Sequence, residues 1–256
     1  MSDPGLDEAI RAVGGVTELA RRIGISQPSV SNWSRVPAER VLSVEAASGV
    51  ARAILRPDLY AEHLDRPDEV DAARAREYAL LSVLLARAPD ADLLRRLARI
   101  AGDASPLGIA HAALAEAARG AGEERVTREF FDLFIGLGRG EFLPYGSYYL
   151  TGFLHERPLA RLRQELIRLR IERAPGLAEP EDHAAILCEI MAGLAGRSLP
   201  APPGADRELF EAHLAPWMGR FFADLERAQT AAFYRSVGML GRVFMQIESE
   251  AFARSG

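Results

Sequence analysis

The sequence predicts an all-α protein in which a small helix-turn-helix domain precedes a larger helical bundle. Apolar residues recur at spacings of three and four in "EYALLSVLLARA", "LARLRQELIRLRIERA" and "AAFYRSVGMLGRVFMQIESEAFA", whereas alternating strand patterns are almost absent. Gly and Pro residues lie at the ends of the periodic runs, where helices stop and start. A chain of 256 residues with 48% apolar content is long enough to bury a sizeable core.

Residues 1–60 contain the predicted helix-turn-helix. The apolar side chains expected to seal its interior are Val16, Leu19, Ala20, Ile23, Ile25, Val30 and Trp33. Gly24 is expected to make the turn, and Ser26 to cap the second helix. The outward positions of that helix are Gln27, Ser29, Ser31, Asn32 and Arg35. Because these residue types can bond to base edges or phosphates, we expect them to form a DNA-binding surface.

The small residue, the Gly, the Val and the Trp fall at offsets that resemble the Cro-like helix-turn-helix of the YdaS type, over about residues 5–60. This resemblance implies DNA binding. The alternative is a helix-turn-helix used only for packing or dimerisation. Residues 14–56 hold six Arg against three acidic residues. Since phosphate neutralisation supplies most nonspecific affinity, one copy is expected to bind DNA weakly and a dimer to be needed.

A linker is predicted at residues 61–72, because "RPDLYAEHLDRPDEVD" carries two Arg-Pro-Asp triplets and little apolar periodicity. The second domain then covers residues 73–256. Residues 61–256 hold 24 Arg against 29 Asp and Glu, so the two parts of the chain have opposite charge. Within the second domain, "GRGEFLPYGSYYLTG" is interpreted as a loop with three tyrosines, and the proline-rich "GRSLPAPPGAD" as non-helical.

Two short elements in the second domain occur in a recognisable order. The first has Tyr145, Ser147, Tyr149 and Leu150, and the second has Glu179, Pro180, Asp182 and His183. This arrangement resembles the TorD/DmsD family of redox-enzyme maturation chaperones, which are all-helical and related to the nitrate reductase delta subunit. The resemblance spans about residues 71–250. It implies a protein that holds a molybdenum- or tungsten-containing oxidoreductase subunit, often through its twin-arginine signal peptide, while the cofactor is inserted.

The second element suggests how such a peptide would be bound. A helix beginning at Pro180 would place Asp182, Ile186 and Glu189 in one row, beside a stripe of His183, Leu187, Ile190 and Leu194. Carboxylates beside an apolar groove suit two guanidiniums followed by an apolar run. The expected client-binding residues are Tyr145, Ser147, Tyr149, Glu179, Asp182, His183, Ile186 and Glu189. The alternative is ordinary helix capping by Pro and acidic residues.

The sequence predicts no catalytic residues, no metal site and no cofactor. The segment "EDHAAILCE" lacks a second His at a ligand spacing, and no nucleophile or phosphate-binding loop is recognisable. A single cysteine, Cys188, and the lack of an export signal or long apolar run favour a cytoplasmic protein with no membrane insertion.

The leading hypothesis is therefore a chaperone for a molybdopterin oxidoreductase of the formate dehydrogenase or DMSO reductase type, with a fused DNA-binding domain. Its expected partners are the apo catalytic subunit or its signal peptide, DNA, and a second copy of the chain. The alternative is a ligand-sensing helix-turn-helix regulator with an all-α sensor domain, which a large enclosed apolar pocket would favour.

Overall fold

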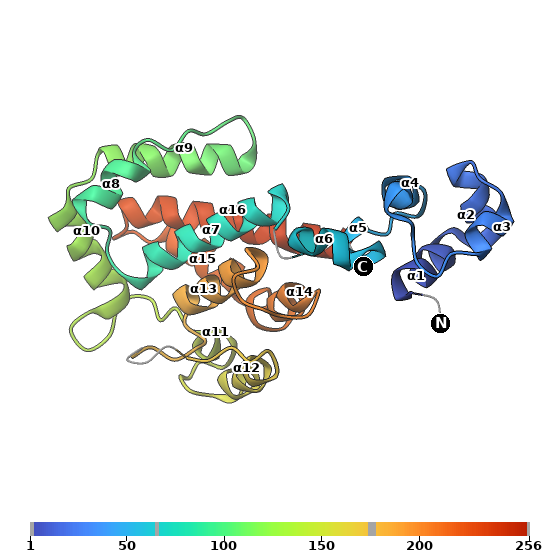
Figure 1. Cartoon of the computed structure of the whole chain (residues 1–256). Helices are drawn as coiled ribbons and strands as arrows, with labels where there is room; N and C mark the ends of the chain where they lie inside the picture. The colour runs from blue at the N-terminus through green and yellow to red at the C-terminus, as the bar shows by residue number, and fades with distance from the viewer. Residues whose placement is uncertain (1–2, 65–66, 174–177, 255–256) are drawn as a thin grey trace. The chain divides into compact units, whose positions relative to one another are not determined.

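The computed structural model describes residues 3–64, 67–173 and 178–254, without the side chains of residues 61–64. The all-α prediction is confirmed: the described residues form helices and no strand, apart from one isolated bridge between Tyr145 and His183 (Figure 1). The chain divides into two compact units, Met1–Asp68 and Glu69–Gly256. No helix in the described part of the chain is long and apolar enough to cross a membrane.

The smaller unit is a cluster of short helices. These are α1 (Pro4–Val13), α2 (Val16–Ile23), α3 (Gln27–Ser31), α4 (Val41–Ser48), α5 (Arg52–Leu55) and α6 (Pro57–Leu64). Helix α6 covers the start of the predicted linker, 61–72, and the next helix begins at Glu69. Residues 65–66 of that linker lie outside the described residues.

Helices α2 and α3 form the expected turn. Gly24 adopts a left-handed conformation with φ 71°, which glycine tolerates without steric cost. The Ile25 N–H then donates to the Ala20 carbonyl at 3.0 Å, which closes the end of α2. Ser26 is the residue before α3, as expected, but its side chain does not cap the helix. Its Oγ instead lies 2.7 Å from Oγ of Ser29.

The larger unit contains the remaining helices. These are α7 (Glu69–Ala86), α8 (Ala91–Leu97), α9 (Pro106–Arg119), α10 (Glu123–Phe130), α11 (Gly146–Thr151), α12 (Arg157–Arg168), α13 (Ala184–Ala195), α14 (Ala205–Leu209), α15 (Met218–Arg227) and α16 (Phe233–Arg254). The segment interpreted as a tyrosine loop therefore contains a helix, α11, whose N-terminus is held by a distant carboxylate, a contact that local sequence does not reveal.

Helix α13 lies at the centre of the larger unit. Ten of its twelve residues are buried, so it reads as almost continuously apolar rather than amphipathic. It packs along α7 on one side, while α15 and α16 pack against each other (Figure 1). The last pair approaches closely because Gly241 faces the ring of Phe222, where a Cβ would lie only 2.2 Å from a ring carbon.

A buried ion-pair network fixes the start of α7. The Arg74 guanidinium lies 2.8 Å from Glu248 on α16, 2.9 Å from Asp206 on α14 and 2.9 Å from Asp71. Glu248 is only 1% exposed and also accepts a hydrogen bond from the Tyr78 hydroxyl at 2.9 Å. Because each buried charge has several partners, α7 is held to two other helices through its first turns.

A second carboxylate joins α11 to the chain just before α13. Oδ2 of Asp182 accepts the Ser147 N–H at 2.7 Å and also the Ser147 hydroxyl, while the Asp182 carbonyl accepts the Gly146 N–H at 2.9 Å. Asp182 is 3% exposed and Ser147 is fully buried. Asp182 thus satisfies N–H groups at the start of α11 that have no partner within that helix. We call this contact the Asp182–Ser147 clasp.

Removing the clasp should destabilise the larger unit. Asp182→Ala leaves the buried Ser147 donors without an acceptor, so we expect it to lower the free energy of unfolding by about 3 kcal/mol. Ser147→Ala removes only the hydroxyl and should cost about 1 kcal/mol. Urea denaturation followed by Trp217 fluorescence, in a Trp33→Phe background, measures both, because the Trp217 indole lies against Gly146. A loss below about 0.5 kcal/mol for Asp182→Ala would contradict the clasp.

The pair of His111 on α9 and Glu77 on α7 should make stability depend on pH. The two side chains are 2.8 Å apart, and the hydrogen bond to Glu77 raises the pKa of His111 although burial opposes it. Protonated His111 therefore stabilises the fold below its unfolded pKa, and this contribution disappears as pH rises through the raised pKa. We expect His111→Gln to cost about 1 kcal/mol at pH 5.5 and less at about pH 8.5 in urea denaturation.

His213 provides the matched control for this pH dependence. Burial lowers its pKa, so the neutral imidazole is favoured in the folded state and its contribution increases as pH rises. His213→Gln should therefore show the opposite trend from His111→Gln. A pH-independent difference between wild type and His111→Gln would exclude the proposed role of the Glu77 pair.

Candidate functional site

The two sequence elements of the larger unit lie against each other. The Tyr145 hydroxyl donates to Oε2 of Glu179 at 2.6 Å, and the rings of Tyr145 and His183 meet edge to face with centroids 5.0 Å apart. With the Asp182–Ser147 clasp, three pairs of side chains connect the elements across more than thirty residues of sequence. Five of the eight expected client-binding residues are therefore brought together at the junction of α11 and α13.

The predicted row of carboxylates does not form. Helix α13 begins at Ala184 and not at Pro180, so Asp182 precedes the helix and does not share a face with Ile186 and Glu189. The carboxylate of Asp182 is directed inward to Ser147, and its Oδ1 is buried with no partner among the described residues. A carboxylate that folds back to satisfy backbone groups is thus unavailable as a surface charge in this structure.

His183 caps α13. Its Nδ1 accepts the Ala185 N–H at 3.1 Å, and the residue is 7% exposed. Burial lowers the pKa of the imidazole, although the carboxylates of Glu179 and Asp182 act in the opposite direction. The neutral imidazole is the form that can accept this hydrogen bond. His183 is therefore a buried helix cap in the described structure.

Tyr149 lies on the other side of α11. Its ring packs with those of Trp217 and Phe221, at centroid distances of 5.5 and 5.8 Å, and its hydroxyl is 3.4 Å from Oδ2 of Asp224. Burial, together with the nearby Asp224, raises the pKa of Tyr149. Tyr149 anchors α11 to α15 through these contacts and does not meet Glu179 or His183.

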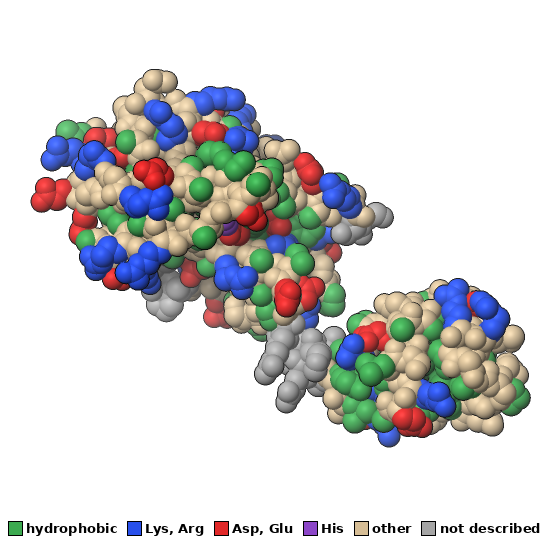
Figure 2. All heavy atoms as spheres, turned by 90° about the horizontal axis from the view of Figure 1, so that it is seen from above, with side chains coloured by type: hydrophobic (Ala, Val, Ile, Leu, Met, Phe, Trp, Pro, Cys, Tyr) green, Lys and Arg blue, Asp and Glu red, His purple; other side chains and the backbone are tan. Residues whose placement is uncertain are grey.

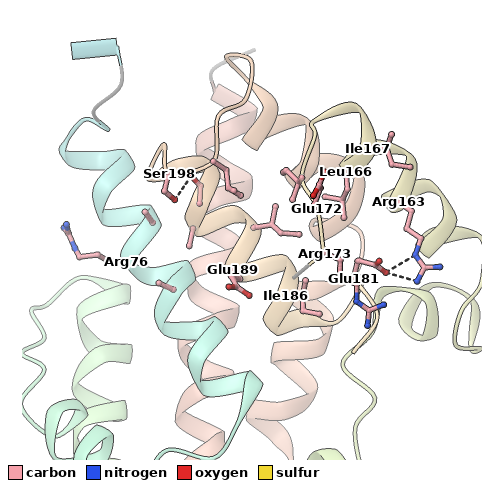
Figure 3. Close-up of a pocket in the computed structure, with 17 residues that line it drawn as sticks. Arg76, Arg163, Leu166, Ile167, Glu172, Arg173, Glu181, Ile186, Glu189 and Ser198 are labelled. Carbon is pink, nitrogen blue, oxygen red and sulfur yellow. Dashed lines mark hydrogen bonds and ion pairs between the residues drawn. The ribbon is translucent and has the colours of Figure 1, made fainter. Parts of the chain in front are cut away.

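An open cavity of about 930 Å³ lies beside α13 (Figure 3). We call it the α13 groove. Helix α13 forms its floor, α7 one wall, and α12 with the residues after it the other wall. Its lining residues are Ala75, Arg76, Ala79, Arg163, Leu166, Ile167, Ile171, Glu172, Arg173, Glu181, Ile186, Glu189, Ile190, Ala192, Gly193, Ser198 and Leu199. Several of these side chains are exposed, so the groove is open to solvent.

Small residues create the groove. Ala75 and Ala79 lie one turn apart on α7 and leave space above the isoleucines of α13. At one end, Leu199 packs on Gly193, where a Cβ would lie 2.6 Å from its Cδ1. On the opposite wall Ile167 is 75% exposed and extends an apolar side chain to solvent. The result is a hollow lined mostly by apolar groups that nothing in the described chain fills.

Charged residues surround this apolar hollow. Arg163 lies 2.8 Å from Glu181, and the Arg173 guanidinium donates to the Glu179 carbonyl at 3.0 Å. Glu172 and Glu189 are exposed and take part in no ion pair between described residues. Of the eight expected client-binding residues, Ile186 and Glu189 line the groove, whereas the other six do not.

Sequence reasoning did not identify the two walls of the groove. Ala75 and Ala79 precede Glu189 by more than a hundred residues, and alanine carries no chemical signal of its own. One signal was present in α12, where Leu159, Leu162 and Leu166 form the buried stripe. Ile167 lies outside that stripe, and an apolar residue outside the stripe of an amphipathic helix is a candidate for an exposed contact surface.

In the smaller unit, all of the expected DNA-binding residues are exposed. They are Gln27, Ser29, Ser31, Asn32 and Arg35. The Gln27 amide donates to Oγ of Ser31 at 2.7 Å, and Arg35 lies 3.5 Å from Asp58. These side chains therefore present hydrogen-bonding groups to solvent, on α3 itself and on the residues that follow it.

The smaller unit as a whole is not basic. Residues 1–68 contain eight Arg and ten Asp and Glu. Several of the arginines are paired: Arg21 and Arg22 lie 2.6 and 2.8 Å from Glu18, and their hydrogen bonds hold the pKa of Glu18 at about 2. Figure 2 shows both charge signs on the visible face of each unit. The basic balance of residues 14–56 thus does not extend to the whole unit.

No group of three or more His, Cys, Asp and Glu side chains within the described residues is arranged to hold a metal ion. Cys188 is fully buried, and burial raises the pKa of its thiol.

Comparison with known proteins assigns each unit separately. Residues 101–223 match the family model described as nitrate reductase delta subunit, and residues 6–64 match the model described as bacterial toxin YdaS. The first match includes α9 to α14 and most of α15, and so covers the floor and one wall of the α13 groove. The second includes the whole helix-turn-helix.

Curated relatives carry the name chaperone protein TorD. The relative from Vibrio atlanticus is 26% identical over 138 residues, which are 50% of this chain and 64% of the relative. One from Vibrio cholerae is 28% identical over 127 residues, covering 46% of this chain and 58% of the relative. One from Shewanella pealeana is 24% identical over 206 residues, covering 71% and 90%. The chain thus spans about three-fifths of the length of the Vibrio relatives.

Both matches agree with the resemblances in the sequence and with the all-α architecture of the two units. Residues 101–223 of this chain are therefore similar to the nitrate reductase delta subunit family, and residues 6–64 are similar to the YdaS family.

Proposed function

We propose that this chain is a cytoplasmic chaperone for the maturation of a molybdenum-containing redox enzyme, and that it binds the immature catalytic subunit or its twin-arginine signal peptide in the α13 groove. The similarity to proteins named TorD supports the general role. The α13 groove supports this binding location, because it is open, mostly apolar and bordered by exposed carboxylates. The proposed client is of the formate dehydrogenase or DMSO reductase type. We assign no catalytic reaction to the chain.

The chemistry of the groove suits such a client. A twin-arginine signal joins two guanidiniums to an apolar run. The isoleucines of α13 and the exposed Ile167 offer apolar contact area, and Glu172 and Glu189 offer carboxylates. The described residues form no sheet, so binding must depend on side-chain contacts and not on the addition of a strand to a sheet edge.

A ligand-sensing regulator is the second candidate, since a cavity of about 930 Å³ is within the range of small-molecule sites. A sensor for an apolar small molecule would be expected to enclose its ligand. The α13 groove is instead bordered by exposed side chains on both walls, which favours an extended polypeptide over a buried small molecule.

Blocking the groove should abolish client capture. Ala79 is exposed on the α7 wall, so Ala79→Trp places a large ring in the groove with little expected effect on stability, within about 0.5 kcal/mol. In pull-downs from the native cell extract, we expect wild type to recover a molybdoenzyme subunit and Ala79→Trp to recover about tenfold less. Ala73 is also exposed on α7 but does not line the groove, so Ala73→Trp should behave as wild type.

The two possible failures of this experiment differ. Equal recovery by Ala79→Trp and Ala73→Trp would show that the client binds elsewhere on the chain. Wild type that recovers no redox-enzyme subunit, while both variants remain folded by circular dichroism, would contradict the chaperone proposal itself.

We also propose that the smaller unit binds DNA through α3 and that two copies of the chain are required. The exposed Gln27 and Asn32 can read base edges, but the unit holds more acidic residues than arginines. One copy would therefore neutralise few phosphates and bind weakly. A dimer places two recognition helices on successive major grooves and so multiplies the contacts.

Base contacts by α3 predict a loss of sequence-specific binding in single variants. In gel shifts at about 50 mM salt with DNA from the protein's own promoter, Gln27→Ala and Asn32→Ala should each cost about 1 to 3 kcal/mol of specific affinity. Their affinity for unrelated DNA should not change. Gln246→Ala, exposed in the larger unit, is the control. If wild type shifts no DNA at this salt concentration, the helix-turn-helix serves packing or dimerisation instead.

A further inference from the structure

Glu189 lies in the middle of the apolar face of α13. Its neighbours on that face, Ile186 and Ile190, are only 8% and 7% exposed, whereas Glu189 itself is exposed. Figure 3 shows its carboxylate between the α7 wall and the α12 wall of the α13 groove. A carboxyl side chain is thus placed where a client would bury apolar surface.

The arginines of the groove do not neutralise Glu189. Arg163 is paired with Glu181 at 2.8 Å, and Arg173 donates to the Glu179 carbonyl at 3.0 Å. Arg76 extends from α7 away from α13 in Figure 3. Glu189 itself forms no hydrogen bond or ion pair with any described residue. Among the described residues, no side chain or backbone group replaces solvent at this exposed carboxylate.

A client that fills the groove must therefore remove water from Glu189. If that client were entirely apolar, the carboxylate would lose its hydration and gain no partner, which opposes binding. A client with a cationic side chain at this point would replace the water with a charge-assisted hydrogen bond in a partly dehydrated site, where the attraction is stronger than in water. One carboxylate thus favours one class of client and penalises the other.

We infer that Glu189 is the specificity-determining residue of the α13 groove, and that it selects polypeptide segments in which a basic side chain directly adjoins an apolar run. This inference rests on the proposed binding of a client segment in the groove. It assigns the discrimination to Glu189 because the neighbours of this residue on α13, Ile186 and Ile190, are buried apolar side chains.

Fluorescence anisotropy with three synthetic peptides tests this assignment on the full chain. Each labelled peptide has about 15 apolar residues preceded by two Arg, two Gln or two Glu. Wild type should bind the Arg peptide about tenfold more tightly than the Gln peptide, equivalent to about 1.4 kcal/mol. Glu189→Gln should reduce this ratio to about twofold or less, and Glu189→Arg should favour the Glu peptide over the Arg peptide.

A matched variant separates Glu189 from the general acidity of the chain. Glu116→Gln changes an exposed carboxylate of α9 outside the groove and should keep the tenfold preference within about twofold. Circular dichroism confirms that each variant is folded. The preference of wild type should also decrease between about 0.05 and 0.5 M salt, as expected for an ion pair that remains partly exposed.

Three results would overturn the inference. Retention of the full preference by Glu189→Gln, or its loss in Glu116→Gln, would remove the role of Glu189. Equal affinity of wild type for the Arg and Gln peptides, with both still blocked by Ala79→Trp, would leave the groove as the client site without charge selection. If wild type binds none of the three peptides, the proposed binding of a leader in the groove fails together with this inference.

Discussion

The α13 groove depends on the Asp182–Ser147 clasp. Helix α11, which the clasp holds at its N-terminus, leads into α12, and Asp182 is followed directly by α13. One buried carboxylate therefore sets the position of both the floor of the groove and one of its walls. The other wall, α7, is fixed independently by the packing of α7 on α13 and by the Arg74 network. The clasp and the Arg74 network thus hold elements of the groove through polar contacts made outside it.

This arrangement separates residues that build the site from residues that would contact a client. Most residues of the two family-like elements, including Ser147, Asp182 and His183, bond to one another or to the backbone. None of the named residues of the two elements lines the groove. Glu181, Ile186 and Glu189, which lie within or just after the second element, do line it. Similarity in the elements thus indicates a shared architecture, whereas the proposed choice of client depends on a side chain, Glu189, that the elements do not include.

The sequence predicted most of the fold, because the helical periodicity and the Gly24 turn are local features. It also grouped Tyr145 and Ser147 with Glu179 and Asp182 as expected client-binding residues, through resemblance and not through spacing. The sequence-based prediction was wrong for Asp182. We expected its carboxylate on the surface, but it is buried because it accepts hydrogen bonds from Ser147. The α7 wall could not be predicted either, because the contact of Ala79 with the groove is set by the packing of helices distant in sequence.

The order of elements along the chain restricts how the two proposed activities could be linked. Helix α7 is the first helix after the boundary between the units and is also a wall of the α13 groove. Allosteric coupling requires two states that each ligand binds with different affinity. Because Arg74 ties the first turns of α7 to α14 and α16, a rigid shift of α7 on client binding would have to break buried ion pairs. A change in the association of two chains would leave these ion pairs intact. It would therefore cost less free energy as a way for client binding to alter the affinity for DNA.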